Sequence, residues 1–319
     1  MVTNSNILLF LALLPVILIL IYIYKKDKVE KEPWGLIIKL LVFGAISCIP
    51  ASFMESFVDH MGPQFPEGSL GYAVTMAFLS AALCEEICKF GFLWLGSWRH
   101  PEFGYRFDGI VYGVATALGF AALENVLYVF QFGFETAIIR AVMAVPLHAF
   151  CGLFMGIFYG AAKKASIDGK SSLKYFVLAL IVPMMIHGIY DTLAFMADPT
   201  ASIILFAFVI AMYIVSIIWV RRFSRDDWKS GFYPETQPLS AGAGGNRAAG
   251  MDPAGAKGYS YGSNYGRQTA MSHPHPGQVH EGKIILVCPY CRHGMRVPAG
   301  LGKIRVQCPH CKNEFVETT

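Results

Sequence analysis

The sequence predicts an all-α polytopic membrane protein with about seven transmembrane helices, followed by a small β zinc-ribbon domain at the C-terminus. Three observations lead to this prediction. Of the 319 residues, 55% are hydrophobic and only 15% are charged, whereas soluble domains carry about a quarter charged residues. The apolar residues gather in long runs, and the C-terminal region instead carries two CxxC pairs.

Seven apolar stretches reach the roughly 20 residues that a helix needs to cross a bilayer. The first begins after MVTNSN, with no Lys or Arg ahead of it, and is followed by YKKDKVEKEPW. This order is the reverse of a secretory signal, so we expect a retained first helix. Pro50, Pro146 and Pro183 are expected to kink their helices. The stretches lie near residues 7–24, 35–58, 71–96, 109–131, 137–162, 175–196 and 200–220.

Lys and Arg concentrate in alternate connections, after the first, third, fifth and seventh stretches. The connections near 59–70, 132–136 and 197–199 contain neither residue. The positive-inside rule then predicts a multi-pass protein of the cytoplasmic membrane with its N-terminus outside and its C-terminus in the cytosol. The net charge of +4 is modest, and we expect the lipid bilayer, not nucleic acid, as the surrounding partner.

The chain is expected to divide into a membrane domain (1–229), a linker (230–281) and a zinc ribbon (282–319). The linker is rich in Gly, Ala, Ser, Tyr and Pro without a periodic apolar face, which is typical of a flexible segment. In the ribbon, CPYC and CPHC are flanked by the strand-like stretches KIILV, GMRVP, KIRVQ and NEFVE. The expected ligands of a closed, structural Zn²⁺ site are Cys288, Cys291, Cys308 and Cys311.

A domain of this size has too little core to fold alone, so metal binding would supply its folding free energy. Two roles for the ribbon stay open: a stable cap, or a docking or sensing module for a cytosolic protein partner. The other four cysteines, Cys48, Cys84, Cys88 and Cys151, lie in apolar stretches and are interpreted as small packing residues.

Ionisable residues interrupt the third apolar stretch, where AALCEEICKFGFLW contains Glu85, Glu86 and Lys89. Each charge near the centre of a membrane helix costs about 2.5–3.5 kcal/mol, so we expect these groups to face protein, water or one another. Their i, i+4 and i, i+3 spacing allows both glutamates to pair with the lysine. A purely structural ion pair would leave the second glutamate unexplained, which favours a functional site.

Three further stretches carry acids and imidazoles, so that four helices offer such groups in one broad layer of the membrane. The fourth stretch has Glu124 and Asn125, and the fifth has His148, which taken alone could be only an interhelical hydrogen-bonding group. The sixth has His187 and Asp191 one helical turn apart, where the carboxylate can fix the imidazole tautomer.

This set of residues is suited to two kinds of chemistry. A glutamate in low dielectric can act as a general base toward water, with imidazoles and a second carboxylate binding the water, a metal ion or a developing oxyanion. The same residue types also make proton or cation pathways. Lys39, Glu55 and Arg140 lie near segment ends, where their side chains can reach water, and we assign them no function.

Three motifs follow one another along these helices: EEICK fits EExxK, FAALE fits FxxxE and HGIYD fits HxxxD. In this order they resemble the PrsW family of intramembrane proteases, which is related to the CaaX-processing and bacteriocin-processing membrane proteases. The resemblance covers residues 35–220 and excludes the linker and the ribbon. It implies cleavage of membrane-anchored substrates, the best-known role being site-1 cleavage of an anti-sigma factor.

The resemblance also implies roles for the site residues. Glu85 or Glu86 would activate the water, and by analogy with the CaaX branch the first glutamate would be the base. The sequence departs from that branch by having a glutamate where the CaaX enzymes have histidine, which leaves open both the oxyanion stabiliser and a bound metal ion. The residues completing the site would be Glu124, His148 and His187, supported by Lys89, Asn125 and Asp191.

Our interpretation is therefore a membrane-embedded peptidase that cleaves a single-pass membrane protein, with its site opening toward the outer half of the bilayer. A proton- or ion-coupled transporter is one alternative, since the acids could shuttle protons. A non-catalytic scaffold that recruits partners through the zinc ribbon is another. A cysteine protease stays a minor alternative, because Cys88 has no histidine next to it in sequence.

Overall fold

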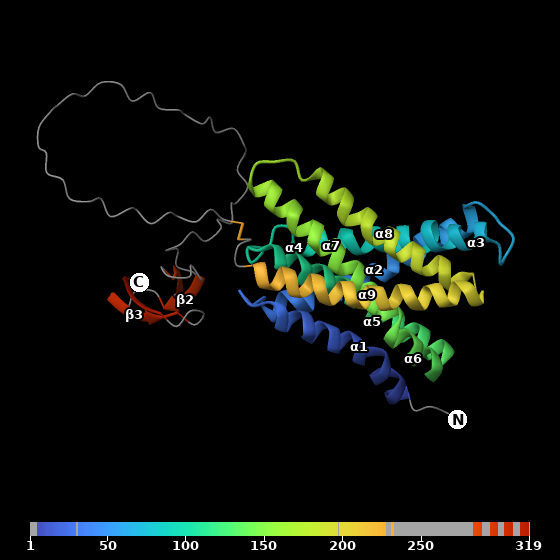
Figure 1. The fold of residues 1–319 in the computed structure, drawn as a ribbon, viewed down its shortest axis with the longest axis horizontal. Coiled ribbons are helices and arrows are strands. Elements are labelled where there is room, and N and C mark those ends of the chain that lie inside the picture. The colour runs from blue at the N-terminus through green and yellow to red at the C-terminus, as the bar shows by residue number, and fades with distance from the viewer. Residues whose placement is uncertain are drawn as a thin grey trace, which may run out of the picture. The chain divides into compact units, whose positions relative to one another are not determined.

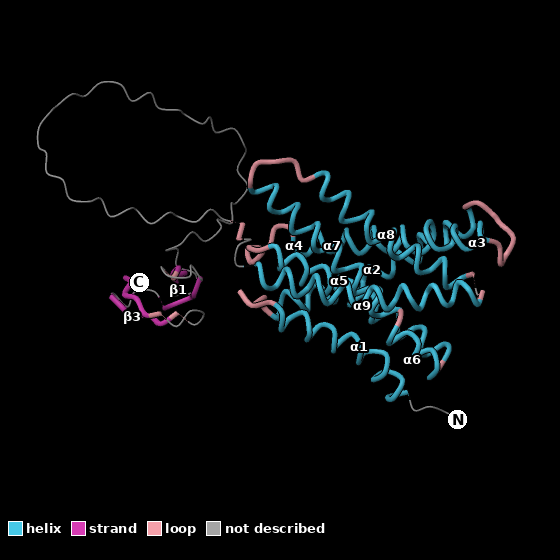
Figure 2. The backbone as a smooth tube through the Cα atoms, in the orientation of Figure 1, coloured by secondary structure: helices cyan, strands magenta, loops and turns pink. Residues whose placement is uncertain are grey.

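The chain divides into two compact units, Met1–Tyr233 and Pro234–Thr319, in the computed structural model. The structure describes residues 5–29, 31–196, 198–227, 231–232, 283–288, 294–298, 303–308 and 313–318. The described part of the first unit is helical apart from its connections, whereas the described part of the second contains strands (Figure 2).

Among the described residues, six helical stretches are long and apolar enough to cross a membrane (Figure 1). Each lies within a few residues of a stretch predicted from the sequence, as expected for a multi-pass membrane protein. They are α1 (Ser5–Lys26), α2 (Trp34–Met61), α5 (Arg106–Phe132), α6 with α7 (Phe134–Ile167), α8 (Leu173–Phe195) and α9 (Pro199–Asp226).

The remaining predicted stretch, 71–96, is helical without a break but is not one uniform α-helix. It consists of α3 (Leu70–Thr75), the π-helical segment η1 (Met76–Ala82) and α4 (Leu83–Ser97). At the end of η1 the backbone N–H of Leu83 donates to the Phe78 carbonyl, five residues back. Such π segments are rare and frequently occur at functional sites, and this one ends immediately before the helix that carries the two glutamates.

The predicted helix 137–162 is divided in the structure into α6 (Phe134–Val142) and α7 (Ala144–Ile167). Pro146 explains the division: it has no N–H to donate, and its ring clashes with the carbonyl four residues earlier, that of Val142. The proline therefore lies in the first turn of α7, where it is tolerated, instead of kinking a longer helix as predicted.

Helix α5 lies at the centre of the first unit and is the most buried of the six spans. It packs most extensively against α7 and also contacts α2 and α1. Glycines allow the close approach to α7, since a Cβ on Gly113 would lie 2.4 Å from the Gly152 carbonyl oxygen and one on Gly156 would lie 2.3 Å from that of Gly109. Small residues of this kind are typical of membrane helix interfaces.

The outer helices present apolar side chains to the exterior, as contact with lipid requires. On α9 these exposed side chains recur every three to four residues and so form one face of the helix. They are Ile203, Phe206, Ile210, Ile214 and Ile218.

One end of the first unit, here called the basic end, contains the connections α1–α2, α4–α5 and α7–α8 and the C-terminus of α9. A polar contact is buried there: the Tyr112 hydroxyl donates to Glu32 Oε2 at 2.8 Å. Burial raises the pKa of Glu32 to about 8, so this carboxyl is mainly protonated at neutral pH. Phe232, within the predicted linker, is buried against Phe103, and its N–H donates to the Gly104 carbonyl.

The second unit contains two antiparallel hairpins at the positions of the four strand-like stretches. Strand β1 (Lys283–Val287) pairs with β2 (Gly294–Pro298), and β3 (Lys303–Gln307) pairs with β4 (Glu314–Thr318). Cys291, Cys311 and most of the predicted linker lie outside the described residues. Side chains from both hairpins form one buried cluster, made of Leu286, Cys288, Met295, Val297, Cys308 and Phe315.

Candidate active site

The two glutamates of α4 converge on one lysine inside the first unit. Lys89 Nζ lies 2.8 Å from Glu85 Oε2 and 2.9 Å from Glu86 Oε1. Lys89 and Glu86 are fully buried, and Glu85 is 6% exposed. The lysine also lies 4.0 Å from the centre of the Phe120 ring, whose face attracts a cation. The charges predicted to face one another therefore do so, away from lipid.

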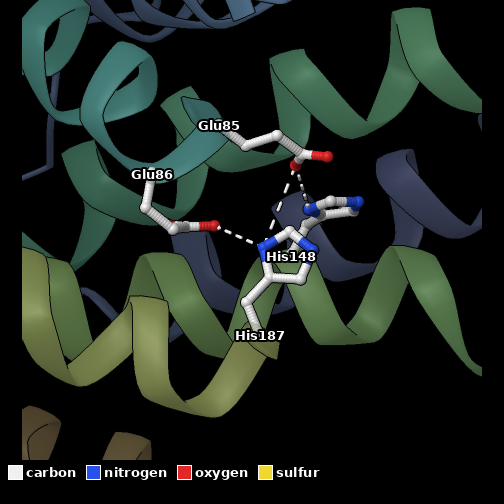
Figure 3. Close-up of side chains that lie close together, drawn as sticks. All are labelled: Glu85, Glu86, His148 and His187. Carbon is white, nitrogen blue, oxygen red and sulfur yellow. Dashed lines mark hydrogen bonds and ion pairs between the residues drawn. The ribbon is translucent and has the colours of Figure 1, made fainter. Parts of the chain in front are cut away.

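Two imidazoles from other helices point their Nδ1 atoms toward the two glutamates (Figure 3). His148, from α7, has Nδ1 3.0 Å from Lys89 Nζ and 3.9 Å from Glu85 Oε2. His187, from α8, has Nδ1 2.9 Å from Glu86 Oε1 and 3.9 Å from Glu85 Oε2. The Glu85 carboxylate is thus within 4 Å of both imidazoles and of the ammonium, at the centre of the cluster.

Each imidazole is held on its far side by a carboxylate. His148 Nε2 lies 2.8 Å from Glu124 Oε2, and His187 Nε2 lies 3.2 Å from Asp191 Oδ2. Because the Lys89 ammonium can only donate, His148 Nδ1 accepts from it, and the proton on Nε2 is donated to Glu124. His187 has a carboxylate at both nitrogens, and it donates to both only as an imidazolium.

Arg140, to which the sequence analysis assigned no function, joins this network. Its Nη2 lies 2.8 Å from Glu124 Oε2, the same oxygen that contacts His148. Its Nε donates to Asn125 Oδ1 at 2.9 Å, and Asn125 in turn donates to the Ala12 carbonyl of α1. The end of α6 turns this guanidinium inward, so it holds Glu124 in place instead of reaching toward water.

The structure therefore brings together every predicted residue of the membrane site. The carboxylate and imidazole ligand atoms of four of them lie within 4.8 Å of one another, and the others surround this group. The central four are Glu85, Glu86, His148 and His187.

These four residues are of the kind that binds a divalent metal ion: carboxylate oxygens and imidazole nitrogens suit zinc, and both imidazoles are backed by carboxylates. Glu86 Oε2 is buried with no hydrogen-bond partner among the described residues, so one ligand oxygen is available. The ion would compete with the Lys89 ammonium for three ligand atoms, Glu85 Oε2, Glu86 Oε1 and His148 Nδ1. It would also have to replace the proton on His187 Nδ1. Binding is therefore expected to release protons and to tighten as the pH rises.

The cysteines near the site do not offer an alternative nucleophile. Cys84 Sγ donates to the Leu79 carbonyl, and Cys88 Sγ faces Met54 Sδ at 3.7 Å. Neither contact provides a base, so these residues pack the helices together, as their positions in an apolar stretch predict.

Comparison with known proteins identifies a family. The family described as PrsW family intramembrane metalloprotease matches residues 32–220, more than half of the chain. The chain belongs to the PrsW family. This match contains α2 to α8 and most of α9, with all three motifs and Arg140, and it excludes α1 and the second unit.

Proteins from three bacteria, each named protease PrsW, are similar to more than half of this chain. The protein of Geobacillus kaustophilus is 37% identical over 179 residues, covering 56% of this chain and 76% of the relative. The protein of Bacillus subtilis is 34% identical, covering 56% of this chain and 78% of the relative. That of Oceanobacillus iheyensis is also 34% identical, covering 65% of this chain and 92% of the relative. No solved structure matches the chain significantly.

Membership of the PrsW family decides between the functional classes that the residues left open. The chain is a membrane protease, and neither the transporter nor the non-catalytic scaffold is needed to explain its buried acids.

Proposed function

We propose that this PrsW-family protease hydrolyses a peptide bond of a single-pass, anti-sigma-factor-like membrane protein, using water activated by Glu85. The observation that carries this proposal is the convergence of Glu85, Glu86, His148 and His187 inside the helical unit. Glu85 is favoured over Glu86 because it is the central and more accessible carboxylate, whereas Lys89 and His187 enclose Glu86. Both features suit a base that must meet water and substrate.

In this mechanism the Glu85 carboxylate takes a proton as the water oxygen bonds to the scissile carbonyl carbon. The Lys89 ammonium, 2.8 Å from Glu85, would stabilise the oxyanion that forms. Glu85 then returns the proton to the leaving nitrogen, and the C–N bond breaks. Glu86 holds Lys89 and His187 in place, while Glu124 and Asp191 fix the orientation of the two imidazoles.

Glu85, Glu86, His148 and His187 are the residues that would hold a metal ion in this site. A bound ion would polarise the scissile carbonyl and acidify the water.

We place the protein in the cytoplasmic membrane with its N-terminus outside and the basic end in the cytosol, which is supported by the distribution of Lys and Arg. We further propose that the second unit is a ribbon holding Zn²⁺ through Cys288, Cys291, Cys308 and Cys311. This is supported by the burial of Cys288 and Cys308 in one cluster shared by both hairpins. The ribbon would then present its surface to a cytosolic protein partner.

The function is tested by comparing membrane proteomes of cells that express wild type or a Glu85→Gln/Glu86→Gln double variant at matched levels. We expect at least one single-pass protein to lose its extracytoplasmic domain only with wild type, since the double variant lacks the proposed base and its neighbouring carboxylate. Identical proteomes, with both proteins folded in the membrane, would contradict the proposal.

Arg140 is expected to act as a positioning residue through Glu124 and His148. Arg140→Gln should lower kcat by about 10–100-fold with a small change in KM, as is typical when a residue behind a functional histidine is lost. Arg140→Lys should recover part of this loss, because lysine keeps the charge but cannot contact Glu124 and Asn125 together. If both variants instead lower the unfolding temperature to the same extent, and kcat falls to the same extent in both, the role of Arg140 is purely structural.

A further inference from the structure

The C-terminal ends of α1 and α9 lie side by side at the basic end of the first unit (Figure 1). A hollow lined by cations lies there. Its volume is about 560 Å³. The two helices are joined beside it, because the Ser224 hydroxyl donates to the Lys26 carbonyl. Five cationic side chains, from the end of α1, the connection after it and the end of α9, line this one space: Lys26, Lys28, Arg221, Arg222 and Arg225.

The positive charge of this hollow exceeds the negative charge beside it. Arg225 pairs with Asp226 at 3.5 Å; the arginine side chain is largely exposed and the aspartate partly so, and an ion pair in contact with water contributes little. Asp27 and Asp227 occur nearby in the sequence, but both are buried and neither lines the hollow. Like charges this close repel one another, and an anion entering the hollow would relieve that repulsion.

The surroundings of the hollow favour an anion that carries apolar chains. Ile218 lines it and belongs to the exposed apolar face of α9, which continues from there along the span through Ile214. Trp219 lies below the Arg222 guanidinium, 5.9 Å from ring centre to charge. Aromatic rings at the end of an apolar span, beside cations, are typical of the level of the lipid headgroups.

We propose that this hollow binds the headgroup of an anionic phospholipid whose acyl chains lie along the apolar face of α9. The phosphate meets the arginines and lysines, as in other basic pockets between membrane helices, and the chains cover Ile214 and Ile218. A free phosphate could use only the first set of contacts. The bound lipid would join α1 to α9 at the point where the chain leaves the membrane for the second unit.

The test uses the full-length protein in nanodiscs of phosphatidylcholine, to which phosphatidylglycerol is added, with retained lipid counted by native mass spectrometry. In Lys28→Gln/Arg221→Gln/Arg222→Gln, affinity for phosphatidylglycerol should fall roughly 100-fold, at about five-fold for each charge removed. The matched control, Lys25→Gln/Lys170→Gln/Lys174→Gln, removes three exposed charges from the same end that do not line the hollow, and it should retain wild-type affinity.

Two results would overturn the proposal. If the control loses as much affinity as the pocket variant, the lipid responds to general surface charge and not to the hollow. If millimolar inorganic phosphate or soluble glycerol phosphate displaces phosphatidylglycerol from the protein, the hollow is a simple anion site. Displacement by neither, together with loss of binding in the pocket variant alone, is the expected result.

Discussion

Glu85→Gln is expected to lower kcat for the cleaved substrate by about 10²–10⁴-fold, the usual contribution of a general base. Glutamine has nearly the same shape and its amide oxygen can still accept from Lys89, so the helix packing should survive. It cannot take a proton from water, so the chemical step should fail. The measurement is cleavage of the substrate by purified, reconstituted protein, with the unfolding temperature recorded alongside.

Glu86→Gln is the matched control, since it makes the same chemical change one residue along α4. Glu86 is fully buried between Lys89 and His187. Weakening a buried charged contact affects stability strongly, by up to about 3–5 kcal/mol when a partner is lost. We therefore expect a larger fall in unfolding temperature and a smaller fall in kcat than for Glu85→Gln. A larger fall in kcat for Glu86→Gln than for Glu85→Gln would make Glu86 the base and Glu85 the structural partner. Wild-type turnover in both variants would exclude water activation by either glutamate.

The positions of the helices were predictable because the bilayer sets a minimum length for an apolar run, and six such runs match structural spans closely. Their internal irregularities were less predictable. The π segment Met76–Ala82 contains no proline or glycine, so no residue type marks it in the sequence. The break at Met143 does have a local signal, the proline at 146, but the sequence alone did not distinguish a kink from a helix start.

The contacts of the candidate site were predictable where both residues lie on the same helix, because their spacing along the sequence then decides whether they meet. The contacts of Lys89 with both glutamates and of His187 with Asp191 follow from i, i+3 and i, i+4 geometry. Contacts between helices did not follow from spacing. Arg140 has the sequence signature of a side chain that reaches the membrane surface, and only the turn of α6 directs it to Glu124. A buried acid needs a countercharge, and a long arginine side chain at a segment end can supply it.

Gly113→Ala and Gly156→Ala are each expected to lower the free energy of unfolding by at least about 2 kcal/mol, toward the upper part of the range for overpacked cores. In both cases the added Cβ would lie under 2.5 Å from a backbone carbonyl of the facing helix, and backbone cannot rotate away as a side chain can. Helices α5 and α7 must then separate. Since α5 carries Glu124 and α7 carries His148, their 2.8 Å contact should lengthen and turnover should fall as well.

Gly91→Ala supplies the control for this prediction, because a Cβ at Gly91, in the middle of α4, would meet nothing within 4 Å. Alanine is the better helix former by about 1 kcal/mol, so this variant should be as stable as wild type or more so. The measurement is thermal unfolding of the full chain in detergent, followed by substrate cleavage. If Gly113→Ala and Gly156→Ala both unfold at the wild-type temperature, close backbone packing of α5 on α7 does not hold the site together.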